Sequence, residues 1–309
     1  MTTINLQLTL GPVLFFWPRD TLLDFYAAAA DWPLDRIYLG EVVCSRRQQM
    51  RPQDWISLAR DLSAAGKQVI LSCQALLESE SDLRRARQLA ANGDIALEAN
   101  DLGAIKLARE HGLPFVAGPH LNIYNADTLK LIRDWGAERW VPPVEMDRAT
   151  LAELLARYAA IGAPIATEVF AWGKLPLALS ARCFTARHYN LSKDDCQFRC
   201  LDHPDGLAMR TQDQQDFLTL NGIQTLSAGC HSLLPHLREL AAAGADAVRI
   251  SPQSRATGDI VALFRQALDG ADLTAQHAAS GRFADGALVD GYWRGQAGNQ
   301  AIGASHAHS

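Results

Sequence analysis

Three cysteines, Cys183, Cys196 and Cys200, lie within 18 residues in the spacing C-x12-C-x3-C. One irregular loop could therefore bring three thiolates around a single inorganic centre. Thiolates prefer soft metals, so zinc and iron–sulfur clusters are the leading candidates, whereas a calcium or magnesium site would use oxygen ligands. Zinc sites commonly use C-x2-4-C pairs, and only Cys196 and Cys200 approach that form. The spacing favours an iron–sulfur cluster, with a zinc site as the alternative.

A fourth ligand must come from elsewhere in the chain, and three cysteines remain. Cys44 follows an apolar run in the segment GEVVCSRR, Cys73 ends the apolar run KQVILSC, and Cys230 lies in SAGCHSL. All three stand near the ends of expected strands. A small buried core residue is the alternative interpretation for Cys73. Spacing alone leaves the choice open.

The composition excludes several function classes. The 309 residues carry a net charge of −5, which leaves little long-range attraction for nucleic acid or anionic lipid. The N-terminal segment lacks the basic start of a signal peptide, and Gly11, Pro12 and Pro18 interrupt its apolar run well short of a membrane span of roughly 20 residues. We therefore expect a cytoplasmic protein, in which the six cysteines stay reduced and serve metal binding or catalysis.

Short apolar runs alternate with amphipathic segments of helical period, which is typical of repeated βα units around a parallel sheet. No G-x-G-x-x-G turn opens an early helix, which disfavours a Rossmann-type sheet. The pattern predicts an α/β fold, a single TIM-barrel-like (β/α) domain with functional residues at the carboxyl ends of its strands. The expected strands are Ile4–Thr9, Arg36–Leu39, Gln68–Ser72, Ile95–Glu98, Phe115–Ala117, Arg139–Val141, Ile165–Phe170, Thr225–Ala228 and Ala247–Ile250.

Residues 171–224 interrupt this alternation. A stretch of this length is far longer than a normal βα loop, and it holds three of the six cysteines. We expect a barrel-like domain over residues 1–270 that includes this cysteine-bearing excursion. Residues 271–309, rich in Gly, Ala, Gln and His, are expected to form a partly mobile C-terminal tail.

The run EVFAWGKLPLALSARC resembles the signature of the collagenase-like peptidase family, E-x-F-x-x-G-[SA]-[LM]-C followed by G-x-C. The resemblance extends from the first expected strand to about residue 270. Lys174 and Ala181 depart from the pattern, and Pro176 stands where the family's first cysteine belongs, so one usual ligand is missing. The matching residues are Glu168, Phe170, Gly173, Leu175 and Cys183.

The missing ligand and the cysteine in GEVVCSRR resemble the branch of this family that acts in oxygen-independent ubiquinone biosynthesis. The resemblance implies a [4Fe-4S] cluster held by Cys44, Cys183, Cys196 and Cys200. It also implies a paralogous partner subunit in a heterodimer and a ubiquinone precursor as substrate. Some relatives hydroxylate RNA bases and are linked to prephenate, so a small organic oxygen donor such as prephenate is implied as well.

The family name suggests proteolysis, but the residues give it little support. The sequence contains neither an H-E-x-x-H zinc helix nor a G-x-S-x-G elbow. A catalytic pair of Cys230 and His231 is conceivable, yet adjacent residues of a strand usually point apart. A peptidase is therefore the last of three hypotheses, after the redox subunit and a zinc-stabilised scaffold.

Strand-end polar residues are the candidates for substrate contact. Each also has a structural interpretation: Asn122 could shape a turn, Glu168 could pair with an arginine, and Arg249 could be a buried structural cation. Arg46, Arg47 and Arg51 follow Cys44, and we expect them in a solvated loop, with tuning of an anionic cluster as the alternative. The candidates for substrate contact are Glu168, Asn122, His120 and Arg249, with Glu98 and Asn100 beside them.

Overall fold

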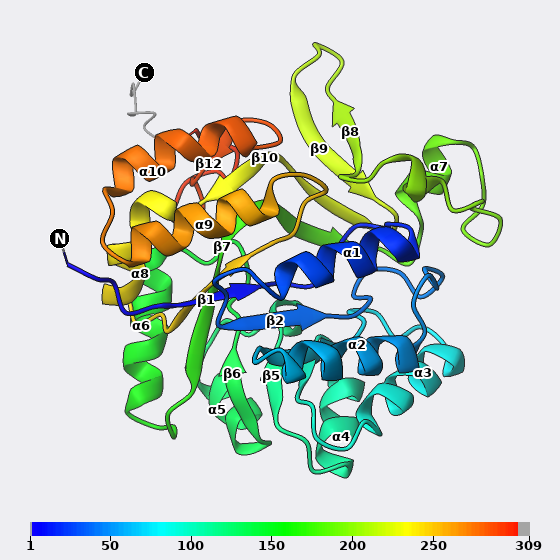
Figure 1. Ribbon diagram of the computed structural model, residues 1–309, viewed down its shortest axis with the longest axis horizontal. Helices are drawn as coiled ribbons and strands as arrows, with labels where there is room; N and C mark the ends of the chain where they lie inside the picture. Colours follow the sequence, from blue (N-terminus) through cyan, green and yellow to red (C-terminus); the bar gives the residue numbers. More distant parts are fainter. Residues whose placement is uncertain (1, 302–309) are drawn as a thin grey trace.

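The computed structural model describes residues 2–301 and shows a closed barrel. Within these residues, eight parallel strands pair in the order β1 to β7 and then β11, and β11 pairs with β1 to close the ring (Figure 1). The predicted TIM-barrel fold is confirmed. The barrel strands are β1 (Gln7–Leu10), β2 (Arg36–Leu39), β3 (Gln68–Ser72), β4 (Leu97–Ala99), β5 (Phe115–Ala117), β6 (Ala137–Trp140), β7 (Ala166–Leu179) and β11 (Ala247–Ile250).

Helices cover the outside of the barrel because each has an apolar stripe. In α2, the buried residues Trp55, Ala59 and Leu62 recur at the spacing of one helix face, and they pack on the outward side chains of the strands. The barrel helices are α1 (Arg19–Ala29), α2 (Pro52–Ala64), α3 (Glu80–Ala90), α4 (Leu102–Glu110), α5 (Ala126–Asp134), α6 (Arg148–Ala159), α8 (Leu237–Ala242) and α9 (Thr257–Leu268), with the short 3-10 helices η1 (Pro119–Leu121) and η3 (Leu234–His236).

The barrel interior is lined by the alternate residues of each strand. Ile37 and Leu39 of β2 belong to the core shared with the helices, whereas Tyr38 between them joins a separate apolar cluster with Ile70 and Val116. Side chains of a strand alternate between its two faces, so this second cluster lies inside the ring. Buried polar side chains share that interior and are described with the site below.

The cysteine-bearing excursion is an extension of the barrel sheet. Strand β7 continues to Leu179, well beyond the expected end at Phe170, and β10 returns antiparallel beside it. The expected strand Thr225–Ala228 therefore exists within β10 but lies outside the barrel ring. The excursion contains α7 (Phe184–His188), η2 (Arg199–Asp202), β8 (Leu207–Arg210), β9 (Asp216–Asn221) and β10 (Gln224–Ser232), and Figure 1 shows it projecting from the barrel.

Residues 271–301 form α10 (Leu273–Ser280), η4 (Gly281–Phe283) and β12 (Leu288–Val289). Strand β12 pairs with β10, and the side chain of Trp293 is buried. The final residues, 302–309, with the terminal histidines of the expected tail, lie outside the described residues. None of the helices in residues 2–301 combines the length and the apolar character that crossing a membrane requires.

Candidate functional site

The loop that carries Cys44 follows β2 at the carboxyl end of the barrel. It leaves the strand through Gly40, where φ is +146° and a Cβ atom would lie 2.3 Å from the carbonyl oxygen of Ser72. Only glycine fits that approach. The carboxylate of Glu41 then accepts the backbone N–H groups of Val43 (2.9 Å) and Cys44 (3.0 Å). These two hydrogen bonds fix the loop and leave Cys44 buried.

The other three cysteines of the candidate centre come from the excursion. Cys183 stands at the start of α7, where its thiol accepts the backbone N–H of Ala186 at 3.4 Å. Cys196 is buried in the loop that follows α7, and Cys200 is partly exposed in η2. The backbone N–H of Phe184 donates to the carbonyl oxygen of Gly222 at 2.8 Å, which ties this loop to the end of β9.

The four cysteines lie close enough for their charges to interact. Burial raises the pKa of the Cys44 thiol, and the neighbouring Cys200 thiol raises it further. Burial also raises the pKa of Cys183, and Cys44 and Cys196 add to that rise. A thiolate beside other thiolates is disfavoured unless a cation or metal compensates. The structure thus brings together the barrel loop and all three cysteines of the excursion.

Cys73 and Cys230 lie elsewhere. Both thiols are buried, and burial raises the pKa of each to about 12. The charges that act on Cys73 after burial are those of Glu98 and Asp101, and Lys174 and Asp285 act on Cys230. Neither thiol joins the group around Cys44.

Arg47 is the cation of this group. Its guanidinium donates to the carbonyl oxygen of Leu14 (2.8 Å) and to Oδ1 of Asn221 (2.6 Å), and its charge acts on the Cys200 thiol. The charge of Arg47 lowers the pKa of Cys44, Cys183 and Cys200 against the effect of burial. Only 4% of Arg47 is exposed, so the expectation of a solvated loop is wrong for this residue.

The arrangement of the side chains gives no further support for a metal site. In the described part of the chain, no group of three or more His, Cys, Asp or Glu side chains is arranged to hold a metal ion. The six cysteines are all free thiols. The metal centre therefore stays a prediction that rests on the type, burial and mutual interaction of the four thiols.

Glu168 and Arg249 lie inside the barrel in a network of buried charges. Glu168 accepts hydrogen bonds from Thr9 (2.8 Å), Tyr38 (2.8 Å) and Nε of Arg249 (2.7 Å). Nη1 of Arg249 donates to Glu98 at 2.6 Å. Burial raises the pKa of Glu168, but the two nearby arginines, Arg249 first, lower it below its ordinary value. Both residues act as structural partners, and only Nη2 of Arg249 is left without a hydrogen bond from residues 2–301.

His120 and Asn122 both follow β5, but their side chains have different surroundings and roles. His120 lies near Glu98 and Arg249 at the mouth of the barrel, and burial lowers the pKa of its imidazole to about 4. Asn122 is exposed and takes a left-handed conformation with φ of 54°, where it ends η1. Asn122 therefore shapes a turn, while His120, Asn100 and Arg249 line a small cavity.

The Cys230 and His231 pair shows no activation for nucleophilic attack. Both residues are buried in β10. Burial lowers the pKa of His231 to about 4, and the Cys230 thiol donates to the carbonyl oxygen of His231 at 3.8 Å. A reactive cysteine needs a thiolate stabilised by a nearby base, and this pair lacks that arrangement.

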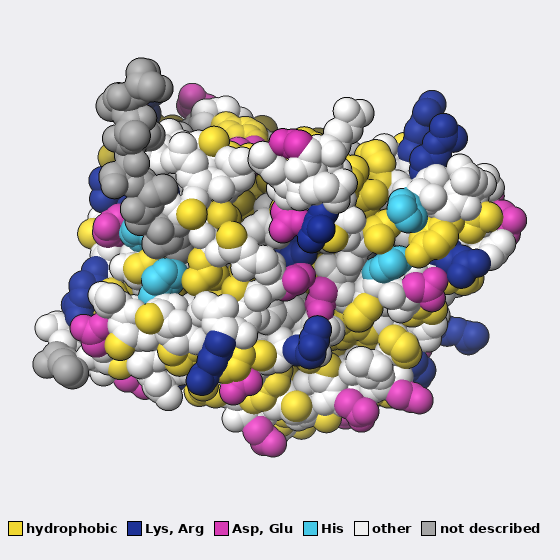
Figure 2. Space-filling view, turned by 90° about the horizontal axis from the view of Figure 1, so that it is seen from above, with side chains coloured by type: hydrophobic (Ala, Val, Ile, Leu, Met, Phe, Trp, Pro, Cys, Tyr) yellow, Lys and Arg dark blue, Asp and Glu magenta, His cyan; other side chains and the backbone are white. Residues whose placement is uncertain are grey.

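Sequence reasoning missed two groups of the candidate centre. Glu41, which orders the Cys44 loop, was not singled out, although it precedes the cysteine in the segment GEVVC. The role of Arg47 as a buried cation beside the thiols was also missed, because its contacts with Leu14 and Asn221 depend on the fold. The surface shown in Figure 2 mixes acidic and basic side chains, without a broad field of one charge.

Comparison with known proteins identifies the family. Residues 22–288 match Peptidase family U32, so the chain belongs to that family. Distant likenesses in solved structures include a tryptophan synthase complex from Pyrococcus furiosus, with 13% identity over 89% of this chain and 97% of that chain and a TM-score of 0.44. A thiamine phosphate pyrophosphorylase from Pyrococcus furiosus has 10% identity over 86% and 98% of the two chains, with a TM-score of 0.44. Likenesses this distant carry no functional argument.

Proposed function

We propose that Cys44, Cys183, Cys196 and Cys200 hold a [4Fe-4S] cluster. The observation that carries this proposal is the convergence of four thiols, from one barrel loop and one excursion, around the buried Arg47. Burial and the neighbouring thiols raise the pKa of Cys44, Cys183 and Cys200, and binding iron as thiolates would compensate that cost. A zinc-stabilised scaffold is the alternative for the same ligands.

The surroundings of the thiols suit a cluster. Hydrogen bonds and charges near the ligand sulfurs tune the potential of iron–sulfur sites, and here Ala186 donates to Cys183 while the charge of Arg47 acts on Cys200. Four protein ligands would saturate the irons, so a bound cluster would supply electron transfer or structural organisation. The chain's own residues would bury the sulfurs, exclude water and balance their charge through Arg47.

We further propose that the chain works in oxygen-independent ubiquinone biosynthesis, as its resemblance to the UbiV branch of the family suggests. Membership of Peptidase family U32 and the replacement of a signature cysteine by Pro176 support this assignment. The partner would be a UbiU-like paralogous subunit in a heterodimer. Ring hydroxylation without dioxygen needs an oxygen donor, for which prephenate is the candidate, and a route for electrons.

A deletion experiment tests this role. A strain that lacks the gene should make normal amounts of ubiquinone in air and little without oxygen, and the wild-type gene should restore anaerobic synthesis. The Cys44→Ala gene should fail to restore it, whereas Cys230→Ala, which changes a buried thiol outside the site, should succeed. Equal ubiquinone yields with and without oxygen in the deletion strain would refute the pathway.

A further inference from the structure

The turn that joins β9 to β10 holds the side chain of Arg47 in place. Nη2 of Arg47 donates to Oδ1 of Asn221 at 2.6 Å, and Nη1 donates to the carbonyl oxygen of Leu14 at 2.8 Å. Arg47 is 4% exposed and Asn221 is 2% exposed, so water does not compete for these two hydrogen bonds. The guanidinium group is therefore fixed between the excursion and the loop that follows β1.

The orientation of the Asn221 amide is set by its other hydrogen bonds. Nδ2 donates to the carbonyl oxygen of Leu14 at 2.8 Å and to Oε1 of Gln224 at 3.1 Å. Both N–H groups of the amide thus have acceptors, which leaves its single oxygen for the guanidinium group of Arg47. With the amide turned round, its N–H groups would face the guanidinium donors, and its oxygen would face two other acceptors. The surroundings of Asn221 therefore match an asparagine that accepts from Arg47.

Glycine at position 222 provides the space that Arg47 needs. The backbone of Gly222 has a φ of +67°, and a Cβ atom there would lie 2.9 Å from Nη2 of Arg47. Side chains are disfavoured at that φ, and any of them would also push the guanidinium group away. The turn thus combines a hydrogen-bond acceptor for the cation with room for it.

The same turn holds the start of α7, where Cys183 lies. The carbonyl oxygen of Gly222 accepts the backbone N–H of Phe184 at 2.8 Å, and the N–H of Gly222 donates to Oγ1 of Thr185 at 2.9 Å. Phe184 and Thr185 directly follow Cys183 in the chain. One turn therefore sets both the place of Arg47 and the place of a candidate ligand, which fixes the spacing between the cation and the thiols.

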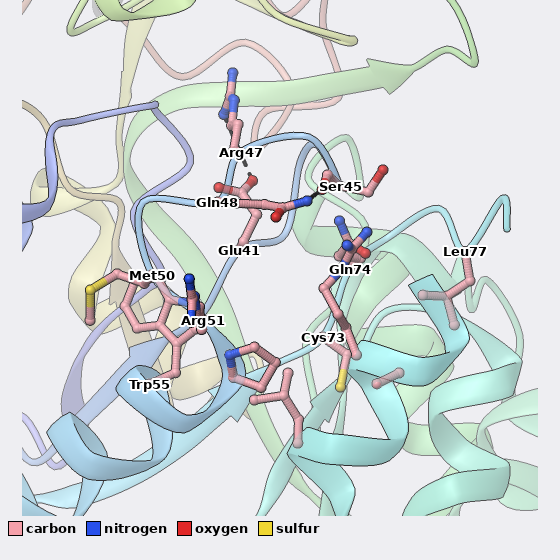
Figure 3. A pocket seen from close by; sticks show the side chains of 14 residues that line it. Glu41, Ser45, Arg47, Gln48, Met50, Arg51, Trp55, Cys73, Gln74 and Leu77 are labelled. Atoms are coloured by element: carbon pink, nitrogen blue, oxygen red, sulfur yellow. Dashed lines mark hydrogen bonds and ion pairs between the residues drawn. The ribbon is translucent and has the colours of Figure 1, made fainter. Parts of the chain in front are cut away.

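The loop of Cys44 contacts Arg47 from the other side. Figure 3 shows the side chain of Arg47 directed away from the pocket that Trp55 and Cys73 line, with a dashed line to Glu41. This ion pair is long, at 3.9 Å, so the hydrogen bond to the turn is the closer constraint on the guanidinium group. The charge held there acts on three of the four candidate ligands.

We propose that Asn221 is a positioning residue for the metal centre: through its hydrogen bond to Arg47 it keeps the arginine charge beside the ligand sulfurs and thereby raises the reduction potential of the cluster. Gly222 provides the space for the same contact. The placement of Arg47 can be measured in the metal-free chain, whereas its effect on the potential rests on the proposed function.

Hydrogen exchange of the Arg47 guanidinium, followed by NMR on the metal-free, isotope-labelled full chain, tests the placement. The wild type should show protected guanidinium N–H signals that are missing from Arg47→Gln, which assigns them. Asn221→Leu removes the acceptor at similar volume, and the signals should exchange about tenfold faster. Asn92→Leu is the matched control: Asn92 is 5% exposed, and its amide donates to two carbonyl oxygens in the turn before β4. Unchanged exchange in Asn221→Leu, or equal acceleration in Asn92→Leu, would overturn the proposal.

Anaerobic spectroelectrochemistry on the iron-loaded chain tests the effect on the cluster. At a fixed potential, Asn221→Leu should lower the ratio of reduced to oxidised cluster about threefold. In an Arg47→Gln background the same substitution should change nothing, because Asn221 acts through Arg47. Loss of stability alone would not produce this dependence on the arginine. Equal shifts in the two backgrounds, or no shift in either, would contradict the positioning role.

A pair of glycine variants tests the contact without removing the asparagine. Gly222→Ala strains the backbone and displaces the guanidinium group, so it should speed the exchange of Arg47 and lower the reduced fraction, as Asn221→Leu does. Gly112→Ala is the control, since φ is +65° there and none of residues 2–301 lies within 4 Å of the added Cβ. It should match the wild type in both measurements. Equal effects of the two glycine variants would refute the contact.

Iron and sulfide analysis of the same samples separates this proposal from the proposed function. A chain without iron, in which Asn221→Leu and Gly222→Ala alone release the Arg47 signals, would support the placement of Arg47 and refute the cluster. A chain that holds the cluster but shows equal exchange in wild type and Asn221→Leu would support the cluster and refute the role of Asn221.

Discussion

Two buried arginines lie in different surroundings in this protein. Arg249, inside the barrel, faces two carboxylates, Glu98 at 2.6 Å and Glu168 at 2.7 Å. Arg47, outside the ring, faces one carboxylate, Glu41, at 3.9 Å, and the thiol of Cys200. The charge of Arg249 is balanced by the barrel itself, whereas the charge of Arg47 is shared with groups that become strongly anionic only when they bind metal.

The surroundings of Arg249 and Arg47 show how a structural buried charge can be distinguished from a functional one in this protein. A buried cation enclosed by carboxylates holds the barrel interior together, and removing it leaves uncompensated charge. A buried cation beside soft-metal ligands can instead lower the cost of placing an anionic cluster next to it. Changes at the two sites should therefore affect different measurements.

The largest effect should follow from Cys44→Ala. Loss of one of four ligands should abolish retention of the cluster, because the excursion supplies only three of the four thiolates that the cluster needs. Iron and sulfide per chain, measured after anaerobic purification, should fall close to zero. Cys73→Ala is the matched control, since Cys73 is a buried thiol away from the centre, and it should keep its iron. The opposite pattern would show that the wrong fourth ligand was chosen.

Next in size is the effect of Arg249→Met on stability. Removing the cation leaves Glu98 buried without its partner and leaves Glu168 with the more distant Arg139 at 3.5 Å, which should lower the free energy of unfolding by about 3–5 kcal/mol. Urea unfolding of both chains in the same metal state measures it. A change below about 1 kcal/mol would mean that the network is not structural.

Arg47→Gln should act on the potential of the cluster more than on the fold. Removing a buried cation whose charge acts on a ligand sulfur, an interaction worth roughly 1.5–3 kcal/mol, should lower the reduction potential by about 60–130 mV. Anaerobic spectroelectrochemistry gives the value. Arg46→Gln alters a neighbouring arginine that donates instead to the backbone oxygen of Asp194, and its shift should be much smaller. Equal shifts for the two variants would remove the special role of Arg47.

The smallest effect concerns His120 at the mouth of the barrel. Burial holds its pKa near 4 in the folded chain, below the ordinary value of 6.5. As the pH falls from 6.5 to 4, the unfolded chain takes up the proton first, so the free energy of unfolding decreases. With allowance for partial exposure, wild type should lose about 1–2 kcal/mol more than His120→Gln over this interval. Parallel pH curves for the two chains would contradict the burial of this imidazole.

Much of the barrel could be predicted from the sequence. Strands β2, β3, β5 and β11 have the bounds that their apolar runs predict, because residues buried on both faces of a parallel strand form continuous apolar segments. The aromatic run from Leu14 to Trp17 is buried, as is typical of large apolar side chains in a core.

The excursion could not be predicted in the same detail. Strand β7 continues through Pro176 and Leu177 because β10 pairs with it along its length, and that pairing joins residues about 50 positions apart. Local sequence carries little trace of such a contact. The same holds for Arg47, whose partners Leu14 and Asn221 lie on distant segments. The identity of the four cysteines could be proposed from spacing and resemblance, but their common surroundings depend on these long-range contacts.

The most direct test of the central claim is iron, sulfide and zinc analysis of the chain purified without oxygen, alone and with the proposed UbiU-like subunit. We expect a brown protein with about four iron and four sulfide per chain. A colourless protein with one zinc and no sulfide would contradict it.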